Sequence, residues 1–540
     1  MSDEPRDADP AGTSHAQRPS DSQRPSGAPR PSDLGRFAWH PEPELLGYTD
    51  AAESREALER LGADAWAMAM DFLFDEAPRR PVGPETYPER RHAYFGPEDR
   101  PGPAPALPAL SRELLAEFRR RLASHQFNAQ HPRQFSYFTP PPLPISIVGE
   151  LLAQWINQGV DFAPTAPTST LVEEEVVRWL CDLVGYGEEA FGVLTSGGVM
   201  ANLMALTVAR DIGLATMLGS REPPRGRALE AVRVYASDQA HFSIARALDV
   251  LGFPPETLHI VPSDERFRLR AGPLSAAIAD DRAAGLRPWC IAAVAGSTST
   301  GSVDDIAGLA DLAAQHGLWL HVDAAYGGAV RLSAREAGRI PALGRADTVT
   351  LDPHKWFFQA YDVGGLLVKR RDDLLQTFHR SPEYLRHSRP QDEPLHWYQY
   401  SIEGTRRFRA LKLWFAWKSL GTEGFGRLIE ANLALAAHLA ARCQEADDFE
   451  ARPAEPELSV VCFRHLPGGA APAAAMDPTD LDHHQDRLQR ALEVSGEGWL
   501  STTRLRGSTW LRAGIVNYLS TEADIDALLA SLRRLASAPA

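Results

Sequence analysis

Lys355 is the residue of this chain whose surroundings point most directly to covalent chemistry. It stands in the segment DPHKWFF (352–358), between a histidine and three aromatic residues. Burial among such side chains removes water from an ammonium group and favours the neutral amine. A neutral lysine amine is a nucleophile that forms Schiff bases with carbonyl compounds. Because most lysines are solvated surface residues, the assignment depends on suitable partners elsewhere in the chain.

Two further polar residues follow apolar runs of sequence. Asp323 comes at the end of LWLHVDA (318–324), where a buried carboxylate is costly unless it meets a cation or hydrogen-bond donors. His241 ends SDQAH (237–241), where an imidazole could stack on a ligand or protonate it. Each also has a simpler interpretation, since Asp323 could cap a helix and His241 could be a structural histidine.

A candidate anion site lies in TSGG (195–198), which precedes the helical pattern VMANL (199–203). A glycine pair lets the backbone approach an anion closely, and the free N–H groups at the start of a helix can bind it. Ser196, Gly197 and Gly198 could therefore hold a phosphate, although the same residues also form ordinary tight turns.

These four segments together fit one cofactor. Pyridoxal 5'-phosphate needs an anchor for its phosphate, a group against its ring, a carboxylate that keeps its pyridine nitrogen protonated and a lysine for its aldehyde. No other common cofactor needs all four, so the sequence predicts pyridoxal phosphate.

The elements that would position these residues alternate along the middle of the chain. Helical spacing separates short apolar runs, which predicts an α/β fold with a mostly parallel sheet flanked by helices. Ligands of such sheets bind beyond the carboxyl ends of the strands, which is where the candidate residues stand. The predicted strands are 232–237, 258–262, 289–296, 318–324, 348–352 and 364–370.

The flanking sequence differs from this middle part. Residues 1–35 are rich in proline and polar residues and predict a disordered tail. Helical patterns at 51–75 and 110–124 belong to an N-terminal helical segment over 36–145. A large cofactor-binding domain is expected over 146–410, and a small α+β C-terminal domain over 411–540.

Composition limits the partners. The 540 residues carry 56 Lys+Arg against 71 Asp+Glu, a net charge of −15, which disfavours nucleic acid and anionic membrane surfaces. The start of the chain lacks an apolar leader, and the uncharged stretch 190–209 contains a polar turn, so we expect a cytoplasmic protein. No metal is expected, because the four cysteines form no CxxC pair and the adjacent His483 and His484 are expected to be solvated.

Several of these segments resemble the pyridoxal-phosphate-dependent group II amino-acid decarboxylases, and most closely their aromatic-L-amino-acid decarboxylase branch. The resemblance covers roughly residues 40–540 and implies a fold-type I enzyme that forms a homodimer with active sites at the subunit interface. The matching segments are HPRQFSYF (131–138), TSGG with ANL (195–203), SDQAHFSIARAL (237–248), HVDAAYGG (321–328), DPHKW (352–356), PEYLRHS (382–388) and RRFRALKLW (406–414).

The resemblance also implies roles for individual residues. Lys355 corresponds to the Schiff-base lysine, Asp323 to the partner of the pyridine nitrogen and His241 to the histidine stacked on the ring. Ser196, Gly197 and Gly198 correspond to the phosphate turn.

Three more residues are implied to lie around the cofactor. Thr298 corresponds to a residue on the 3'-oxygen side of the ring, Ala325 to one packed under it, and His354 to one beside the lysine.

The expected reaction is decarboxylation of an L-amino acid to an amine and CO₂. In similar decarboxylases the tyrosine at the position of Tyr384 returns a proton to the substrate carbon, whereas related aldehyde synthases carry phenylalanine there. His241 is an alternative proton donor. A transaminase or a non-catalytic regulator that binds the cofactor remains a different possibility.

The substrate stays open. Tyr137, Phe138 and Trp356 suggest an aromatic or other non-acidic substrate, although each could equally be core packing, and 2,4-diaminobutyrate or an aliphatic amino acid is an alternative. Asp352 stands where the resembling enzymes tend to have asparagine, and Thr139 replaces an expected proline. We expect the Asp352 charge to be either offset or turned away, and we do not assign Asp352 to the site.

Overall fold

The computed structural model describes residues 52–76, 79–83, 85–97, 99–104, 111–380 and 395–537. The predicted tail and Tyr384 lie outside these residues. The chain divides into two units, one formed by 1–69 with 103–120 and the other by 70–102 with 121–540. Most of α1 (Ala52–Asp71) and α3 (Ser111–Arg121) belongs to the first unit. The domain boundaries expected at 36, 146 and 411 stay predictions.

The second unit contains a seven-stranded sheet in the order β1-β7-β6-β5-β4-β2-β3. The pairs from β6 through β5, β4 and β2 to β3 are all parallel, which confirms the predicted α/β class. The strands are β1 (Phe191–Thr195), β2 (Val232–Ser237), β3 (Leu258–Val261), β4 (Arg287–Val294), β5 (Trp319–Asp323), β6 (Thr348–Leu351) and β7 (Gly364–Val368).

Two strands at one edge differ from the simple alternating pattern. β1 is an addition to the predicted strands, and β7 runs antiparallel to both of its neighbours, β1 and β6. Thr195 pairs with Gly364 and Leu351 pairs with Gly365. The segment between β6 and β7, which contains Lys355, therefore returns directly to the strand beside the candidate phosphate turn.

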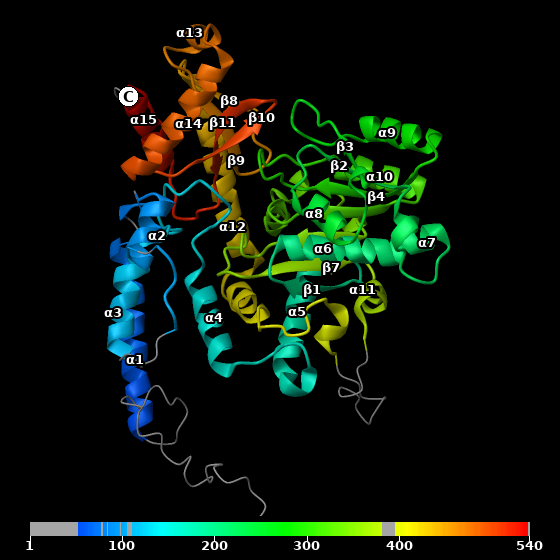
Figure 1. The fold of residues 1–540 in the computed structure, drawn as a ribbon, viewed down its shortest axis with the longest axis horizontal. Helices are drawn as coiled ribbons and strands as arrows, with labels where there is room; N and C mark the ends of the chain where they lie inside the picture. Colours follow the sequence, from blue (N-terminus) through cyan, green and yellow to red (C-terminus); the bar gives the residue numbers. More distant parts are fainter. Residues whose placement is uncertain are drawn as a thin grey trace, which may run out of the picture. The chain divides into compact units, whose positions relative to one another are not determined.

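Helices flank this sheet, as Figure 1 shows. Their ends follow ordinary capping chemistry: in α10, Asp305 accepts a hydrogen bond from the Gly308 N–H, and Gly317 ends the helix with φ of 66°. The helices between and beside the strands are α4 (Pro144–Ile156), α5 (Pro167–Val184), α6 (Gly198–Val208), α7 (Ala215–Leu218), α8 (Ser243–Val250), α9 (Ala271–Ala283), α10 (Ile306–His316) and α11 (Arg371–Phe378).

The C-terminal part has its own antiparallel sheet in the order β10-β11-β9-β8, which confirms the small α+β region. It packs with helices around a second apolar core that includes Leu439, Phe463, Leu511 and Leu528. Its strands are β8 (Phe449–Arg452), β9 (Val460–His465), β10 (Ser501–Leu505) and β11 (Ser508–Gly514). The other helices are α2 (Tyr87–Phe95), α12 (Ala410–Glu445), α13 (Ala470–Ala474), α14 (Pro478–Ser495) and α15 (Glu522–Ser537).

The expectation that His483 and His484 are both solvated is half wrong. Both lie on α14, where His483 is exposed but His484 faces the core. His484 Nε2 lies 2.9 Å from His465 Nδ1 of β9. Adjacent helical residues point in different directions, which explains why one is buried and the other is not. The described residues contain no cluster of His, Cys, Asp and Glu that could hold a metal.

One helical stretch, Gly198–Leu218, is long and apolar enough by length and composition to cross a membrane. Most of it is buried inside the protein, and its first part, α6, contacts β5, β6, β7 and α8. It therefore has the surroundings of a core helix.

Candidate active site

The carboxyl ends of the parallel strands converge on a cavity of about 330 Å³. Each segment predicted from the sequence contributes to its lining, as expected for this kind of sheet. All nine residues predicted to bind the cofactor line the cavity: Ser196, Gly197, Gly198, His241, Thr298, Asp323, Ala325, His354 and Lys355. The structure brings these residues together, and their individual roles stay predictions.

The turn between β1 and α6 has a shape that needs glycine. Gly197 has φ of 155°, and a Cβ built on it would lie 3.3 Å from His354 Cε1. A Cβ on Gly198 would lie 2.8 Å from Asp352 Oδ2. No side chain among the described residues caps the first turn of α6. Its backbone N–H groups are therefore available to an anion in the cavity.

Asp323 at the end of β5 is buried but well supplied with donors. Its Oδ1 accepts a hydrogen bond from the Ala325 N–H at 3.1 Å, and its Oδ2 accepts one from Asn202 Nδ2 at 2.7 Å. Within the described part of the chain it forms no ion pair, so its charge is available to a cation in the cavity.

Asn202 is a residue that the sequence analysis did not assign to the site. Its amide nitrogen donates to Asp323 and also to Ser243 Oγ at 2.8 Å. Its carbonyl oxygen accepts from Thr350 Oγ1 at 2.7 Å and lies 3.0 Å from His321 Nε2. Asn202 thus holds Asp323 in place. Its position four residues after Gly198, one turn into α6, was the available signal, because that spacing returns to the same helix face.

The same chain of hydrogen bonds fixes the proton on His241. Ser243 donates its backbone N–H to His241 Nδ1 at 3.3 Å, and its hydroxyl lies 2.8 Å from the same atom. Because Nδ1 accepts, the ring proton belongs on Nε2. Burial lowers the pKa of His241, and nearby Asp323 offsets this only in part, so the neutral ring is favoured.

Lys355 differs from expectation in its charge. Burial by itself lowers the pKa of this lysine, but Asp352 and Asp323 outweigh it, so that the pKa is raised. Its Nζ lies 3.0 Å from Asp352 Oδ2. The prediction that the aromatic surroundings favour the neutral amine is therefore wrong for the free lysine, because carboxylates rather than aromatic rings lie closest to the nitrogen.

Of the two expectations for the Asp352 charge, that it is offset or turned away, the structure shows the first, because Lys355 Nζ lies 3.0 Å from Asp352 Oδ2. Leaving Asp352 out of the site is nevertheless wrong. Asp352 lines the cavity and is buried. Its Oδ1 is buried without a hydrogen-bond partner among the described residues. The main chain holds it there, since the Asp352 N–H donates to the Ala325 carbonyl at 3.1 Å.

The segment after Asp352 is held by several backbone hydrogen bonds. The Lys355 N–H donates to the Asp352 carbonyl at 2.8 Å, and the His354 N–H donates to the Val363 carbonyl at 3.1 Å. The Val363 N–H in turn donates to His354 Nδ1 at 3.3 Å. Burial lowers the pKa of His354, an effect that Asp352 opposes, so His354 is favoured in the neutral form.

The three residues predicted for a substrate pocket do not lie together in this cavity. Trp356 is 0% exposed, donates to Asn432 Oδ1 at 2.9 Å and stacks on Tyr326, so it is a core residue. The residue after the lysine points into the core because the lysine itself faces the cavity. Phe138 is buried and also stacks on Tyr326, with 4.0 Å between ring centroids. Tyr137 is 57% exposed.

Arg512 on β11 is another residue not singled out from the sequence. Its Nε donates to the Thr298 carbonyl at 2.8 Å, and its guanidinium lies 4.7 Å from the centre of the Phe138 ring. It thereby supports the cavity wall formed by Thr298. Tyr384, the predicted proton donor, lies outside the described residues.

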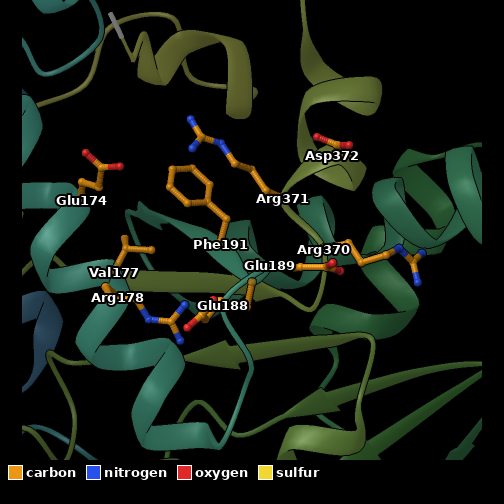
Figure 2. A pocket seen from close by; sticks show the side chains of 10 residues that line it. Glu174, Val177, Arg178, Glu188, Glu189, Phe191, Arg370, Arg371 and Asp372 are labelled. Carbon is orange, nitrogen blue, oxygen red and sulfur yellow. The ribbon is translucent and has the colours of Figure 1, made fainter.

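A second cavity of about 530 Å³ lies between α5, the residues before β1 and the start of α11, as Figure 2 shows. Its arginines are already held by the chain. Arg371 lies 4.6 Å from the centre of the Phe191 ring and donates to Tyr400 Oη, while Arg178 pairs with Asp182 at 2.7 Å. This cavity contains none of the predicted site residues.

The first cavity fits pyridoxal phosphate. The glycine turn offers free N–H groups to a phosphate, Asp323 has an unpaired charge for the ring nitrogen, and the Lys355 amine faces the space between them. Comparison with known proteins agrees. The model of the pyridoxal-dependent decarboxylase conserved domain matches residues 98–466.

Individual relatives and structures extend this match. The chain is 34% identical to an aromatic-L-amino-acid decarboxylase of Bacillus atrophaeus, covering 79% of this chain and 85% of that protein. It is 29% identical to an L-2,4-diaminobutyrate decarboxylase of Acinetobacter baumannii, covering 74% and 79%. The crystal structure of Oryza sativa TDC with PLP and tryptamine superposes with a TM-score of 0.82 at 25% identity, covering 91% of this chain and 99% of that one.

Proposed function

This chain belongs to the pyridoxal-dependent decarboxylase family and is a pyridoxal-phosphate-dependent amino-acid decarboxylase, and we propose that its substrate is an aromatic or other non-acidic L-amino acid. The observation that carries the proposal is the cavity lining. Among the described residues it contains one lysine, Lys355, which would hold the cofactor, and no arginine. An acidic substrate side chain would therefore find no further lysine or arginine in this lining to bind it.

Trp356 is a core residue and therefore does not support a non-acidic substrate. The charges of the cavity lining support it instead. The aromatic preference is supported by the identity to the Bacillus atrophaeus relative and by the apolar lining residues Val199, Met200 and Tyr326. Decarboxylation of 2,4-diaminobutyrate is the alternative, supported by the 29% identity to an L-2,4-diaminobutyrate decarboxylase.

Each residue of the site has a proposed role in decarboxylation. When bound, pyridoxal phosphate draws electrons from the substrate's α-carbon, which lets the carboxylate leave as CO₂. Lys355 would hold the cofactor through its amine nitrogen Nζ. Asp323, fixed by Asn202, would keep a proton on the ring nitrogen, and the glycine turn would bind and orient the phosphate. His241, protonated on Nε2, and Tyr384 are the two candidates for returning a proton to the α-carbon.

The test of this function is CO₂ release from the twenty common amino acids, DOPA, 2,4-diaminobutyrate and cysteine sulfinate, with the amine product identified. We expect turnover of one or more aromatic amino acids and none of the acidic ones. Lys355→Ala should lose the mass increase that borohydride reduction of the loaded protein leaves on this lysine. Activity confined to acidic substrates, or a fully active Lys355→Ala variant, would contradict the proposal.

Tyr384 bears on the reaction type. Tyr384→Phe should shift the products from amine towards aldehyde, ammonia and hydrogen peroxide, with dissolved dioxygen as the oxidant, because the competing proton donor is lost. The measurement is the ratio of amine to aldehyde, with Tyr87→Phe as a control at an exposed tyrosine that does not line the cavity. An unchanged amine yield would assign the proton transfer to His241 or another group.

We further propose that the chain forms a homodimer with the site near the subunit interface. Exposed apolar side chains around the cavity segments, among them Tyr137, Val199 and Phe242, support this proposal. Light scattering of the purified protein measures the mass directly.

A further inference from the structure

Asp352 brings a second carboxylate into the cofactor cavity, at a place where it meets the phosphate turn. Its Oδ2 lies 2.8 Å from where a Cβ on Gly198 would be, and its Oδ1 lies 2.7 Å from where a Cβ on Gly364 would be. Asp352 is 2% exposed, so little water reaches it. A phosphate held by the N–H groups of the turn would therefore be close to this carboxyl group.

The groups that face Asp352 offer it one cation. Lys355 Nζ lies at 3.0 Å and His354 Nε2 at 3.8 Å, but burial favours neutral His354. His241, also favoured neutral, and the acidic Asp323 face the same space from β2 and β5, and Tyr361 lies near Lys355. Lys355 is thus the partner that balances the Asp352 charge in the free protein.

Cofactor binding changes this balance, because Lys355 Nζ would then be bonded to the cofactor and any charge it keeps would be shared with that group. The phosphate would add negative charge beside a buried carboxylate. Two anionic groups that share a desolvated site cannot both stay ionised without a large cost, and a proton shared between them relieves it. Asp352 Oδ2, which faces the phosphate turn, is the oxygen that would carry this proton.

We propose that Asp352 is a cofactor-binding residue that takes up a proton when the phosphate group enters the turn, and that it then donates a hydrogen bond to a phosphate oxygen. The proton comes from solvent and stays between the carboxyl group and the phosphate. The inference rests on the proposed use of this cavity for pyridoxal phosphate. It predicts that cofactor affinity falls as pH rises, by up to about tenfold per pH unit.

The experiment is calorimetric titration of the cofactor-free protein with pyridoxal 5'-phosphate in two buffers of different ionisation enthalpy, which gives the number of protons taken up. Pyridoxal, which lacks the phosphate, is the matched ligand. For each protein, the number of protons taken up with pyridoxal is subtracted from the number taken up with pyridoxal 5'-phosphate. This difference should be about one proton larger for the wild type than for Asp352→Asn. The asparagine variant should also lose the decline of affinity with pH.

Equal proton uptake by the two proteins would overturn the inference while leaving the cofactor assignment intact. If Asp352→Asn does not fold, the comparison of the two ligands on the wild type decides alone: the absence of extra uptake with pyridoxal phosphate overturns the inference. Failure to bind pyridoxal phosphate, with no borohydride-trapped mass at Lys355, would instead overturn the proposed function and this inference with it.

Discussion

Asp323 ends β5 and His241 follows β2, yet a single pair of residues, Asn202 and Ser243, fixes both side chains. Asn202 donates to Asp323 Oδ2 and to Ser243 Oγ, and Ser243 contacts His241 Nδ1. The orientation of the carboxylate and the ring proton of the imidazole therefore depend on one buried network.

Ser243→Ala tests this network without removing a group that touches the cofactor. The variant loses the hydroxyl that contacts His241 Nδ1, and we expect kcat to fall about tenfold, in line with the loss of one buried hydrogen bond. Cofactor affinity should change little, because Asn202 still binds Asp323. Steady-state kinetics over a range of pH and a cofactor titration measure the two effects.

Ser220→Ala provides the comparison for that variant, since Ser220 is an exposed serine whose hydroxyl donates to the Glu222 carbonyl. Equal kcat values for the two variants would show that Ser243 has no role in the mechanism.

Lys355 and its neighbours show how much of a site can be predicted from residue types alone. The identity of Lys355, Asp323 and the glycine turn could be read from the sequence, because few residue types perform these tasks and each follows an apolar run. The directions of Asp352 and Trp356 could not, because they depend on how the chain turns after β6. Asp352 lines the cavity although the sequence analysis left it out of the site, and Trp356 takes the core position that was its alternative interpretation.

At the scale of elements, the phosphate turn depends on how β1 is anchored to α5. Arg406 is buried, pairs with Glu173 of α5 and donates to the Leu194 carbonyl at 2.7 Å. Glu173 accepts from the Leu194 N–H at 3.2 Å. This buried pair binds both polar groups of the residue that precedes Thr195, at the end of the strand.

Arg406→Met should lower the free energy of unfolding by about 3–5 kcal/mol, because it leaves Glu173 buried without its cation. Arg427→Ala, which breaks an exposed pair with Glu423 on α12, should cost less than about 1 kcal/mol. Urea unfolding followed by circular dichroism compares the two. A similar, small loss in both variants would show that the buried pair does not stabilise this edge of the sheet.

Some elements were not predicted because their sequences lack a clear apolar pattern. β10 alternates polar residues at the edge of its sheet, and α14 has a narrow apolar stripe of Leu481, Leu488 and Leu492 within a polar sequence. The direction of β7 also could not be predicted from the sequence, because an apolar run does not indicate whether a strand is parallel or antiparallel to its neighbours. The six predicted strands were visible because both faces of that sheet are covered.

At the scale of the whole molecule, buried neutral histidines make stability depend on pH. Burial lowers the pKa of His131, His321 and His484 to about 4, with neighbouring Arg133 acting on the first and His465 and Arg487 on the last. Between pH 4 and 6.5 the unfolded chain binds more protons than the folded one. The free energy of unfolding therefore rises with pH through this range.

The neighbours His483 and His484 allow a matched test of this dependence. His484→Gln should reduce the gain in unfolding free energy between pH 5 and pH 7 by about 1–2 kcal/mol, because one buried titrating group is lost. His483→Gln should leave the gain as in the wild type, since His483 is exposed. Urea unfolding at the two pH values measures the difference. Identical slopes for all three proteins would exclude His484 as a contributor.

The attachment of the segment around Lys355 has a consequence for how reactants arrive. This segment leaves the sheet at Leu351 of β6 and rejoins it at Gly364 of β7, beside Thr195 of β1. A displacement of the Lys355 backbone by several ångströms would break strand pairing on both sides of β7 at once. The Lys355 main chain is therefore expected to stay in place during turnover while its flexible side chain moves, and any opening and closing of the entrance would be carried out by another part of the chain.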